Sequence, residues 1–140
     1  MTTEPLSLDA ALASFDAIWS PRIVAQINDY DVRVAKVRGD FVWHVHEDTD
    51  EFFLVLDGTF DIALREPGHA ECTVRLNRGD VFVVPRGAEH RPSSSGASIL
   101  MFERTGTSNT GDRHDDIPDY ADSTTGHGLA LATDAAGQPS

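Results

Sequence analysis

The chain has 140 residues, of which 40% are hydrophobic and 24% charged, a composition typical of one globular domain with a single core. Its 23 acidic residues against 11 basic ones give a net charge of −12, which repels nucleic-acid phosphates and anionic lipid. No apolar run approaches the roughly 20 residues of a membrane span, and no secretory leader is recognisable. Cys72 is the one cysteine, which excludes an intrachain disulfide. We therefore expect a cytoplasmic protein with neither nucleic-acid nor membrane partners.

Residues 1–21 predict a short amphipathic helix. Apolar residues recur at helical spacing between Leu8 and Trp19, and Ser7 in front of them is a good N-cap residue. Pro21 ends the pattern. We expect this helix to form a small segment separate from the main domain.

Residues 22–103 predict an all-β domain, because short runs of β-branched and aromatic residues alternate there with turn residues. Asp57-Gly58 predicts a tight hairpin, since a type I′ turn needs positive φ at both central positions. The expected strands are Arg22–Ile27, Tyr30–Arg38, Phe41–His46, Glu51–Leu56, Thr59–Leu64, Cys72–Leu76, Val81–Val84 and Ala97–Phe102.

Several of these strands are apolar on both faces, so both faces must be covered. A dimer partner, the N-terminal helix or a second sheet of the same subunit would serve, and the sequence leaves the three alternatives open. Cys72 is expected to be a buried, inert thiol. The expected core members are Trp43, Phe53, Phe60, Phe82 and Met101.

Residues 104–140 hold few core-forming residues among many Gly, Ser, Thr and Asp. We predict an extended, polar C-terminal tail that is weakly anchored to the domain.

Histidine and carboxylate side chains gather in one part of the predicted domain. His44 and His46 are two residues apart, so on a strand they project from one face as a pair of imidazole ligands. A short loop would fold the next strand back and bring Glu51 beside them. Asp48 or Asp50 could take this place, but the shared parity of Glu51 with the apolar positions that follow favours Glu51.

A third histidine, His90, follows a strand and a Pro/Gly turn. Together the two segments resemble the two motifs of the cupin superfamily, G-x5-H-x-H-x(3,4)-E-x6-G and G-x5-P-x-G-x2-H-x3-N. The first motif here reads Gly39-x4-His44-x-His46-x4-Glu51-x6-Gly58, one residue short after its first glycine. The second reads Gly79-x5-Pro85-x-Gly87-x2-His90-x3-Ser94, with serine in the place of asparagine.

The resemblance is to small single-domain members of the cupin 2, RmlC-like type. It implies a double-stranded β-helix (jelly-roll) barrel in which His44, His46, Glu51 and His90 bind one divalent metal. Three imidazoles and one carboxylate suit Fe, Mn, Ni, Cu, Co or Zn better than Ca or Mg. Four protein ligands would leave two positions of an octahedral ion for water, substrate or dioxygen. The histidines in polar turn or tail sequence are expected at the surface: His69, His114 and His127.

The sequence supports three functions. The first is a metal-dependent enzyme acting on a small organic molecule, either a dioxygenase or an isomerase or lyase that uses Lewis-acid chemistry. The second is a non-catalytic cupin that binds or senses a small ligand. The third, a relict barrel, is disfavoured by the intact ligand set. We also expect a homodimer, and a division into residues 1–21, 22–103 and 104–140.

Sugar-phosphate isomerase activity, with which small barrels of this type are often labelled, is disfavoured. Phosphate binding calls for Arg or Lys in the pocket. The predicted inward positions are apolar: Val42, Phe53, Val55, Phe60, Ile62, Phe82 and Val84. Contacts at the rim remain open to Arg38, Arg65, Arg86 and Arg91.

Overall fold

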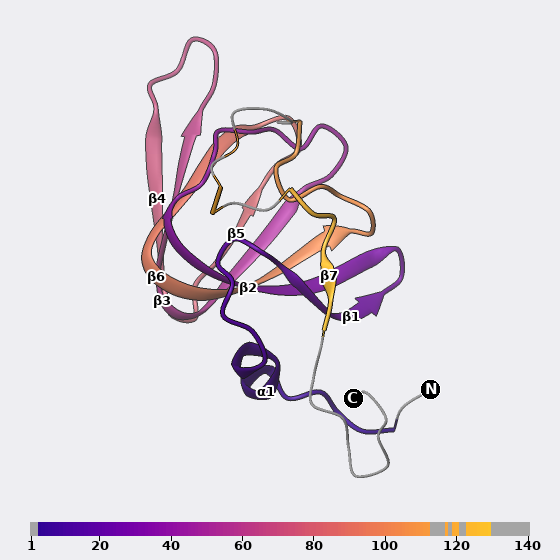
Figure 1. Cartoon of the computed structure of the whole chain (residues 1–140). Coiled ribbons are helices and arrows are strands. Elements are labelled where there is room, and N and C mark those ends of the chain that lie inside the picture. The colour runs from indigo at the N-terminus through magenta and orange to yellow at the C-terminus, as the bar shows by residue number, and fades with distance from the viewer. Residues whose placement is uncertain (1–2, 113–116, 118, 121–122, 130–140) are drawn as a thin grey trace.

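The computed structural model describes residues 3–112, 117, 119–120 and 123–129. One helix, α1 (Leu8–Ala13), precedes the strands (Figure 1). These are β1 (Arg22–Ile27), β2 (Tyr30–Asp40), β3 (Glu51–Arg65), β4 (Cys72–Asn77), β5 (Val81–Val84), β6 (Glu89–Arg104) and β7 (His127–Gly128).

The strands form one sheet in the order β4-β3-β6-β2-β1-β7, with β5 paired to β3. The sheet curls around an apolar interior, and α1 lies outside it (Figure 1). This is the all-β jelly-roll barrel with a short N-terminal helix that the sequence predicts. The division of the chain into three segments stays a prediction. No helix among the described residues is long and apolar enough to cross a membrane.

The N-terminal helix is capped as expected but ends early. The Ser7 hydroxyl accepts a hydrogen bond from the Ala10 amide at 3.2 Å, and α1 stops after six residues. Trp19 has a φ of 53°, which a right-handed helix does not accommodate. Its indole instead stacks on Phe41 and donates to the Arg38 carbonyl at 2.8 Å. The apolar residues after the helix therefore pack through an extended segment.

The predicted hairpin at Asp57-Gly58 is wrong, because β3 continues through it as one strand of 15 residues. β3 pairs with β6 along its length, and its register shifts on both sides of Gly58. Gly58 has a φ of 81°, and a Cβ there would lie 2.1 Å from the Gly96 carbonyl oxygen. The Asp57-Gly58 pair therefore serves a bulge that bends a long strand around the barrel.

The predicted strand Phe41–His46 is also wrong. Only His44 of this segment pairs with another strand, through an isolated β-bridge to His90. The Phe41 amide donates to the Pro92 carbonyl at 2.8 Å, but Pro92 has no N–H with which to extend the ladder. The segment is therefore held by a few separate backbone hydrogen bonds.

Three of the five expected core residues are buried, namely Phe53, Phe60 and Met101. Phe82 is partly buried against that core, while Trp43 is half-buried under the Arg65 guanidinium, 3.9 Å from its ring centre. Cys72 is exposed, and the expectation of a buried thiol is wrong. It is the first residue of β4, which lies at the end of the sheet order.

The outer face of the sheet is covered unevenly. Phe15, after α1, packs under the Arg22 guanidinium and the Lys36 ammonium, and its carbonyl accepts from Lys36 at 2.6 Å. Val81, Val83 and Phe102 on β5 and β6 stay exposed. Phe15 in the N-terminal segment thus covers part of β1 and β2.

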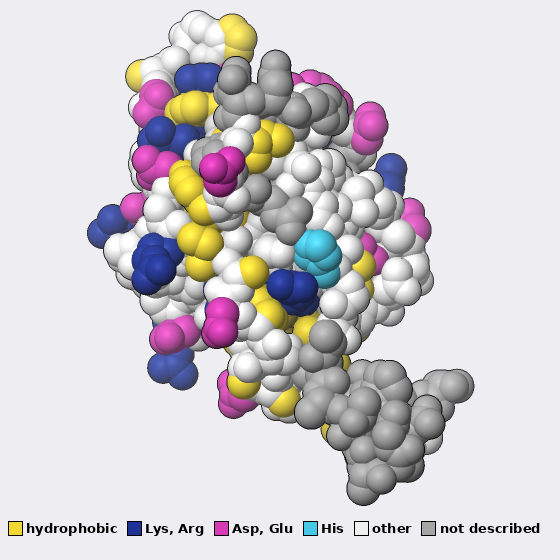
Figure 2. All heavy atoms as spheres, in the orientation of Figure 1, with side chains coloured by type: hydrophobic (Ala, Val, Ile, Leu, Met, Phe, Trp, Pro, Cys, Tyr) yellow, Lys and Arg dark blue, Asp and Glu magenta, His cyan; other side chains and the backbone are white. Residues whose placement is uncertain are grey.

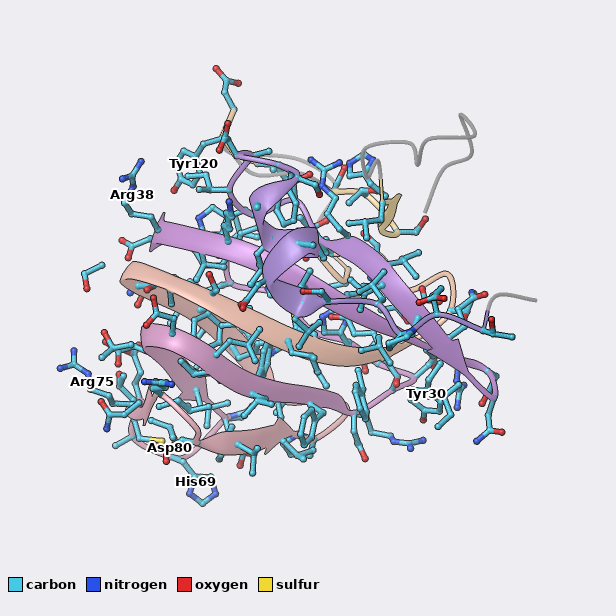
Figure 3. All side chains as sticks on the ribbon, turned by 90° about the horizontal axis from the view of Figure 1, so that it is seen from below. Tyr30, Arg38, His69, Arg75, Asp80 and Tyr120 are labelled. Carbon is cyan, nitrogen blue, oxygen red and sulfur yellow. The ribbon has the colours of Figure 1, made fainter. Side chains whose placement is uncertain are left out.

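Charged side chains are spread over the surface. On the face in Figure 2, acidic and basic groups are interspersed rather than gathered into one basic patch. His69 projects away from the sheet in Figure 3 and is exposed, as predicted. His127 is half-buried in β7, and His114 lies outside the described residues.

The close approach of the Gly58 and Gly96 backbones predicts that a side chain at position 58 lowers the stability of the fold. We expect Gly58→Ala to lower the free energy of unfolding by about 3–5 kcal/mol, because positive φ and a backbone clash act together. Gly79→Ala is the matched control, since Gly79 has a φ of 87° with nothing within 4 Å of the added Cβ. It should lose only about 1–2 kcal/mol. Equal losses in urea unfolding would contradict a role for the clash.

Candidate metal centre

Four buried side chains converge inside the barrel. His44, His46, Glu51 and His90 each offer one ligand atom, and these atoms all lie within 4.8 Å of one another. Each residue is at most 6% exposed. The structure thus brings together all four residues singled out from the sequence, and the group could hold a metal ion.

The strands and turns around the cluster explain its position. Backbone hydrogen bonds of 3.0 Å join His44 and His90 in both directions, so the bridge between the irregular segment and β6 sets the two rings 4.3 Å apart. The Gly87 amide donates to the His46 carbonyl at 2.9 Å, which ties the Pro/Gly turn to the second histidine. Glu51 begins β3, where it pairs with Val84 of β5.

Backbone carbonyls orient two of the imidazole rings. Nδ1 of His44 lies 2.8 Å from the Val42 carbonyl, and Nδ1 of His90 lies 3.0 Å from the Ala88 carbonyl. A neutral ring that donates from Nδ1 presents the lone pair of Nε2. Nε2 of His90 lies 3.0 Å from Glu51 Oε1, so it points at the centre of the cluster.

The donor set fits a divalent metal. His46 Nε2 is buried without a hydrogen bond of good geometry, although Glu51 Oε2 lies 3.2 Å away. A buried polar atom without such a partner costs free energy, and an ion among the four ligands would satisfy it. Three imidazoles and one carboxylate are donors that Fe, Mn, Ni, Cu, Co and Zn accept.

Burial sets the charge of the cluster. It lowers the pKa of His44 to about 3, helped by the nearby His90 and His46, so this ring is neutral at neutral pH. Burial alone would raise the pKa of Glu51, but His46 and hydrogen bonds hold that pKa well below its usual range. Burial opposes protonation of His46, yet the Glu51 carboxylate raises the pKa of its ring. His44 and Glu51 are therefore in the neutral and ionised forms that bind metal, whereas metal binding at His46 must displace the proton that Glu51 favours.

Asp48 and Asp50, the alternatives to Glu51, lie outside the cluster. Both are exposed, and Asp50 accepts from the Arg86 amide at 2.9 Å. That hydrogen bond and the Arg86 charge lower the pKa of Asp50. Of the three residues considered for this ligand position, Asp48, Asp50 and Glu51, the cluster therefore includes only Glu51.

Two cavities adjoin the cluster. The inner one has a volume of about 20 Å³, bordered by His44, Glu51 and apolar side chains, and has room for one ion or water. The other, about 420 Å³, reaches His46 between the loop after it and the segment after β6. Its acidic wall residues are Glu47, Asp48 and Asp112.

A short segment after β6, residues 108–112, crosses the cluster; we call it the strap. The Asp112 amide donates to the Val45 carbonyl at 3.0 Å, and the Val45 amide donates to Asp112 Oδ1 at 2.9 Å. A Cβ on Gly111 would lie 3.0 Å from Cδ2 of His44. One of these hydrogen bonds joins two backbone groups and the other is accepted by the Asp112 carboxylate. Neither needs apolar residues, which is why composition alone predicted a weakly anchored tail.

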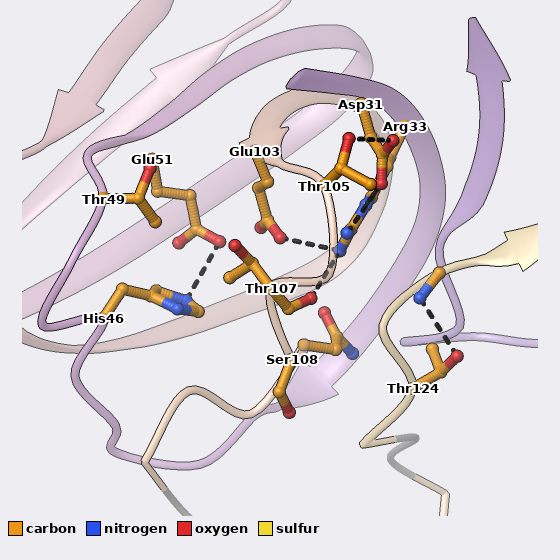
Figure 4. A network of polar contacts seen from close by, with 12 residues as sticks. Asp31, Arg33, His46, Thr49, Glu51, Glu103, Thr105, Thr107, Ser108 and Thr124 are labelled. Atoms are coloured by element: carbon orange, nitrogen blue, oxygen red, sulfur yellow. Dashed lines mark hydrogen bonds and ion pairs between the residues drawn. The ribbon is translucent and has the colours of Figure 1, made fainter. Parts of the chain in front are cut away.

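A buried charged network, missed by the sequence analysis, lies beside the cluster (Figure 4). Arg33 donates from Nη1 to Glu103 Oε2 at 2.8 Å and from Nη2 to Asp31 Oδ2 at 3.0 Å. All three residues are fully buried. Their parity with the core residues Ala35 and Val37 of β2, and with Ile99 and Met101 of β6, was the signal that could have revealed them.

Arg33 is a buried charge that the prediction of an apolar pocket did not include, but it does not create a phosphate site. The guanidinium already donates to Asp31, to Glu103 and, at 3.0 Å, to the Thr107 carbonyl. Burial and the Glu51 carboxylate raise the pKa of Glu103 well above its usual range. The apolar residues that the sequence predicts to face inward are all buried, apart from Phe82, which is partly buried.

Comparison with known proteins identifies the family. The model of the cupin domain family (Cupin_2) matches residues 31–102. The chain belongs to the cupin domain family. It is 35% identical over 71 residues to the uncharacterized protein YdbB of Bacillus subtilis (strain 168), and this match covers 51% of the chain and 59% of that relative's length.

Two solved structures show the same cupin fold. A cupin-2 domain containing protein from Shewanella frigidimarina NCIMB 400 is 38% identical, with a TM-score of 0.66 and coverage of 71% of this chain and 93% of that one. Hydroquinone 1,2-dioxygenase from Sphingomonas sp. TTNP3, solved with 4-nitrophenol, is 21% identical, with a TM-score of 0.65. The latter match covers 72% of this chain and 32% of the dioxygenase, and it shows the fold alone.

The lowered pKa of His44 predicts a pH dependence of stability in the metal-free protein. Below pH 6.5 the unfolded chain protonates His44 while the folded chain does not until about pH 3, so stability falls as the pH falls. Between pH 6.5 and 5 this residue should cost about 2 kcal/mol. His44→Asn should remove that part of the slope in urea unfolding, and His69→Asn should not. A slope unchanged in His44→Asn would contradict the buried neutral ring.

Proposed function

We propose that this cupin is a metal-dependent enzyme that acts on a small organic molecule. One divalent transition metal, Fe, Mn, Ni, Cu, Co or Zn, would be held by His44, His46, Glu51 and His90. The supporting observation is that one ligand atom from each of these four buried side chains converges on the same place. Among these atoms, His46 Nε2 has no protein hydrogen-bond partner of good geometry, which leaves it available to an ion.

The metal would supply Lewis-acid or redox chemistry to a bound substrate. The protein residues prepare the site for it. The Val42 and Ala88 carbonyls fix the tautomers of His44 and His90, so their Nε2 lone pairs face inward. Apolar side chains such as Phe53 and Phe60 border the inner cavity and limit water there.

The reaction would be either a dioxygenation or an isomerase or lyase reaction. The shared fold with hydroquinone 1,2-dioxygenase supports testing the first class with phenolic substrates. In the second class a side chain must also transfer a proton. The cavity of about 420 Å³ that reaches His46 offers a route for the substrate. The three carboxylates on its wall outnumber the one guanidinium there, that of Arg104, which favours uncharged or cationic molecules over phosphates.

The alternative is a non-catalytic cupin that binds or senses a small ligand. The inner cavity, about 20 Å³, is too small for an organic molecule, and the strap crosses His44. Under this alternative the metal organises the barrel, and a ligand occupies only the outer cavity. The homodimer and the cytoplasmic location also stay predictions, and sedimentation at several concentrations measures the first.

Metal content and oxygen uptake test the proposal. Protein purified without added metal should contain about one transition-metal ion per chain by elemental analysis. His46→Ala should lower metal occupancy at least tenfold, because it removes a ligand. His69→Ala, an exposed histidine outside the cluster, should retain full occupancy. Full metal content in His46→Ala would show that the ligand assignment is wrong.

Oxygen consumption with catechols, hydroquinones, flavonols, thiols and β-diketones separates the reaction classes. Uptake with one class of substrate, lost in His46→Ala, supports a dioxygenase. A metal-loaded protein that consumes no oxygen and converts none of these compounds favours the Lewis-acid or binding alternatives.

A further inference from the structure

We propose that Glu103, held by Arg33, is a positioning residue for Glu51, the carboxylate ligand of the proposed metal site. The inference rests on the proposed function, because it assigns Glu51 to the metal. It gives the buried network a role in setting the geometry of the cluster, in addition to any role in stability.

The contacts form a chain from Arg33 to the cluster. Arg33 Nη1 donates to Oε2 of Glu103 at 2.8 Å, which leaves Oε1 without a donor from the protein. Glu103 is within hydrogen-bonding reach of Glu51, and the two carboxyl groups lie side by side in Figure 4. Glu51 in turn lies 3.0 Å from His90 Nε2 and 3.2 Å from His46 Nε2.

Arg33 itself is fixed on several sides. Its Nε and Nη2 donate to Asp31 Oδ2 at 3.3 and 3.0 Å, and its Nη1 also donates to the Thr107 carbonyl. Asp31 is held by Thr105 at 2.9 Å and by Gln26 at 3.0 Å. The guanidinium therefore cannot turn away from Glu103 without breaking bonds to β2 and to the segment before the strap.

This arrangement restricts the rotation of Glu51. A carboxylate at the start of a strand has two side-chain torsions before the carboxyl group, and either oxygen could collapse onto a histidine. A carboxyl group beside it, locked by Arg33, limits the orientations in which Glu51 can point its oxygens. Partners of this kind tune metal affinity by about 10–100-fold in other metal sites.

Cobalt titration of the full chain tests the positioning role. The probe is Co²⁺ alone, added to metal-free wild type, Glu103→Gln, Glu103→Asp and Glu103→Leu. The amide of Glu103→Gln keeps the length and both contacts, so its Kd should stay within about 3-fold of wild type. Glu103→Asp is too short to reach Glu51, and Glu103→Leu has no polar group. Both should bind Co²⁺ about 10–100-fold more weakly.

The ligand-field spectrum of bound Co²⁺ separates positioning from stability. At saturating Co²⁺, the absorption bands of Glu103→Asp should shift because Glu51 coordinates differently, and those of Glu103→Gln should match wild type. Urea unfolding gives the fraction folded for each variant, so Kd refers to folded protein. Asp61→Leu, which breaks an exposed arginine pair, is the control and should change neither Kd nor spectrum.

The outcomes are distinguishable. Wild type that binds no Co²⁺ overturns the proposed function and this inference with it. Wild type that binds, with Glu103→Asp equal to it in Kd and spectrum, overturns only the positioning role. Weaker binding and shifted bands in Glu103→Asp, restored in Glu103→Gln, support it even where Glu103→Leu fails to fold.

Discussion

Excess negative charge inside an apolar barrel is the constraint on which the rest of this structure depends. Three carboxyl groups, those of Asp31, Glu51 and Glu103, are buried beside one guanidinium, Arg33. Buried carboxylates are costly unless they are paired, so this excess calls for a proton, which the raised pKa of Glu103 favours on that residue, and for a cation beside Glu51. A divalent ion among His44, His46, Glu51 and His90 would supply the missing positive charge and the missing partner of His46 at once.

The fold converts that constraint into a site with fixed geometry. A bulge at Gly58 bends β3 around the barrel, which allows β6 to pair along most of β3 and brings the His90 ring within 3.0 Å of the Glu51 carboxylate. The irregular segment carrying His44 and His46 is joined to β6 by the bridge between His44 and His90 and by the hydrogen bond from Phe41 to Pro92. The strap then crosses His44, and Arg33 links the segment just before it, at Thr107, to the charged network. The ligands thus come from separate elements, each held by backbone hydrogen bonds.

The sequence predicted the sheet class and the four converging residues because both depend on local patterns. Alternation of side chains reveals strands, and the motif spacing marks His44, His46, Glu51 and His90. It failed where distant segments decide the outcome. Asp57-Gly58 has the composition of a hairpin turn, but the backbone of Gly96 beside it selects a bulge. Arg33 was not singled out from the sequence, because its burial depends on its remote partner Glu103 on β6.

The tail shows the same limit. Residues 104–140 lack apolar anchors, and composition alone indicated weak attachment. The described part is held by backbone hydrogen bonds, such as those from Asn109 to Thr124 at 2.7 Å and from Asp112 to Val45, and by the polar side chains of Asp112 and Asn109. The backbone bonds do not depend on residue type, and the side-chain bonds need partners remote in sequence, so composition does not reveal them.

Anomalous diffraction from crystals of the metal-loaded protein tests the central claim most directly. Data collected on both sides of the absorption edge of the bound metal should give one strong peak per chain, about 2.0–2.3 Å from Nε2 of His44, His46 and His90 and from a carboxylate oxygen of Glu51. A peak at the exposed carboxylates of Glu47, Asp48 or Asp112, with none among the three histidines, would contradict the account.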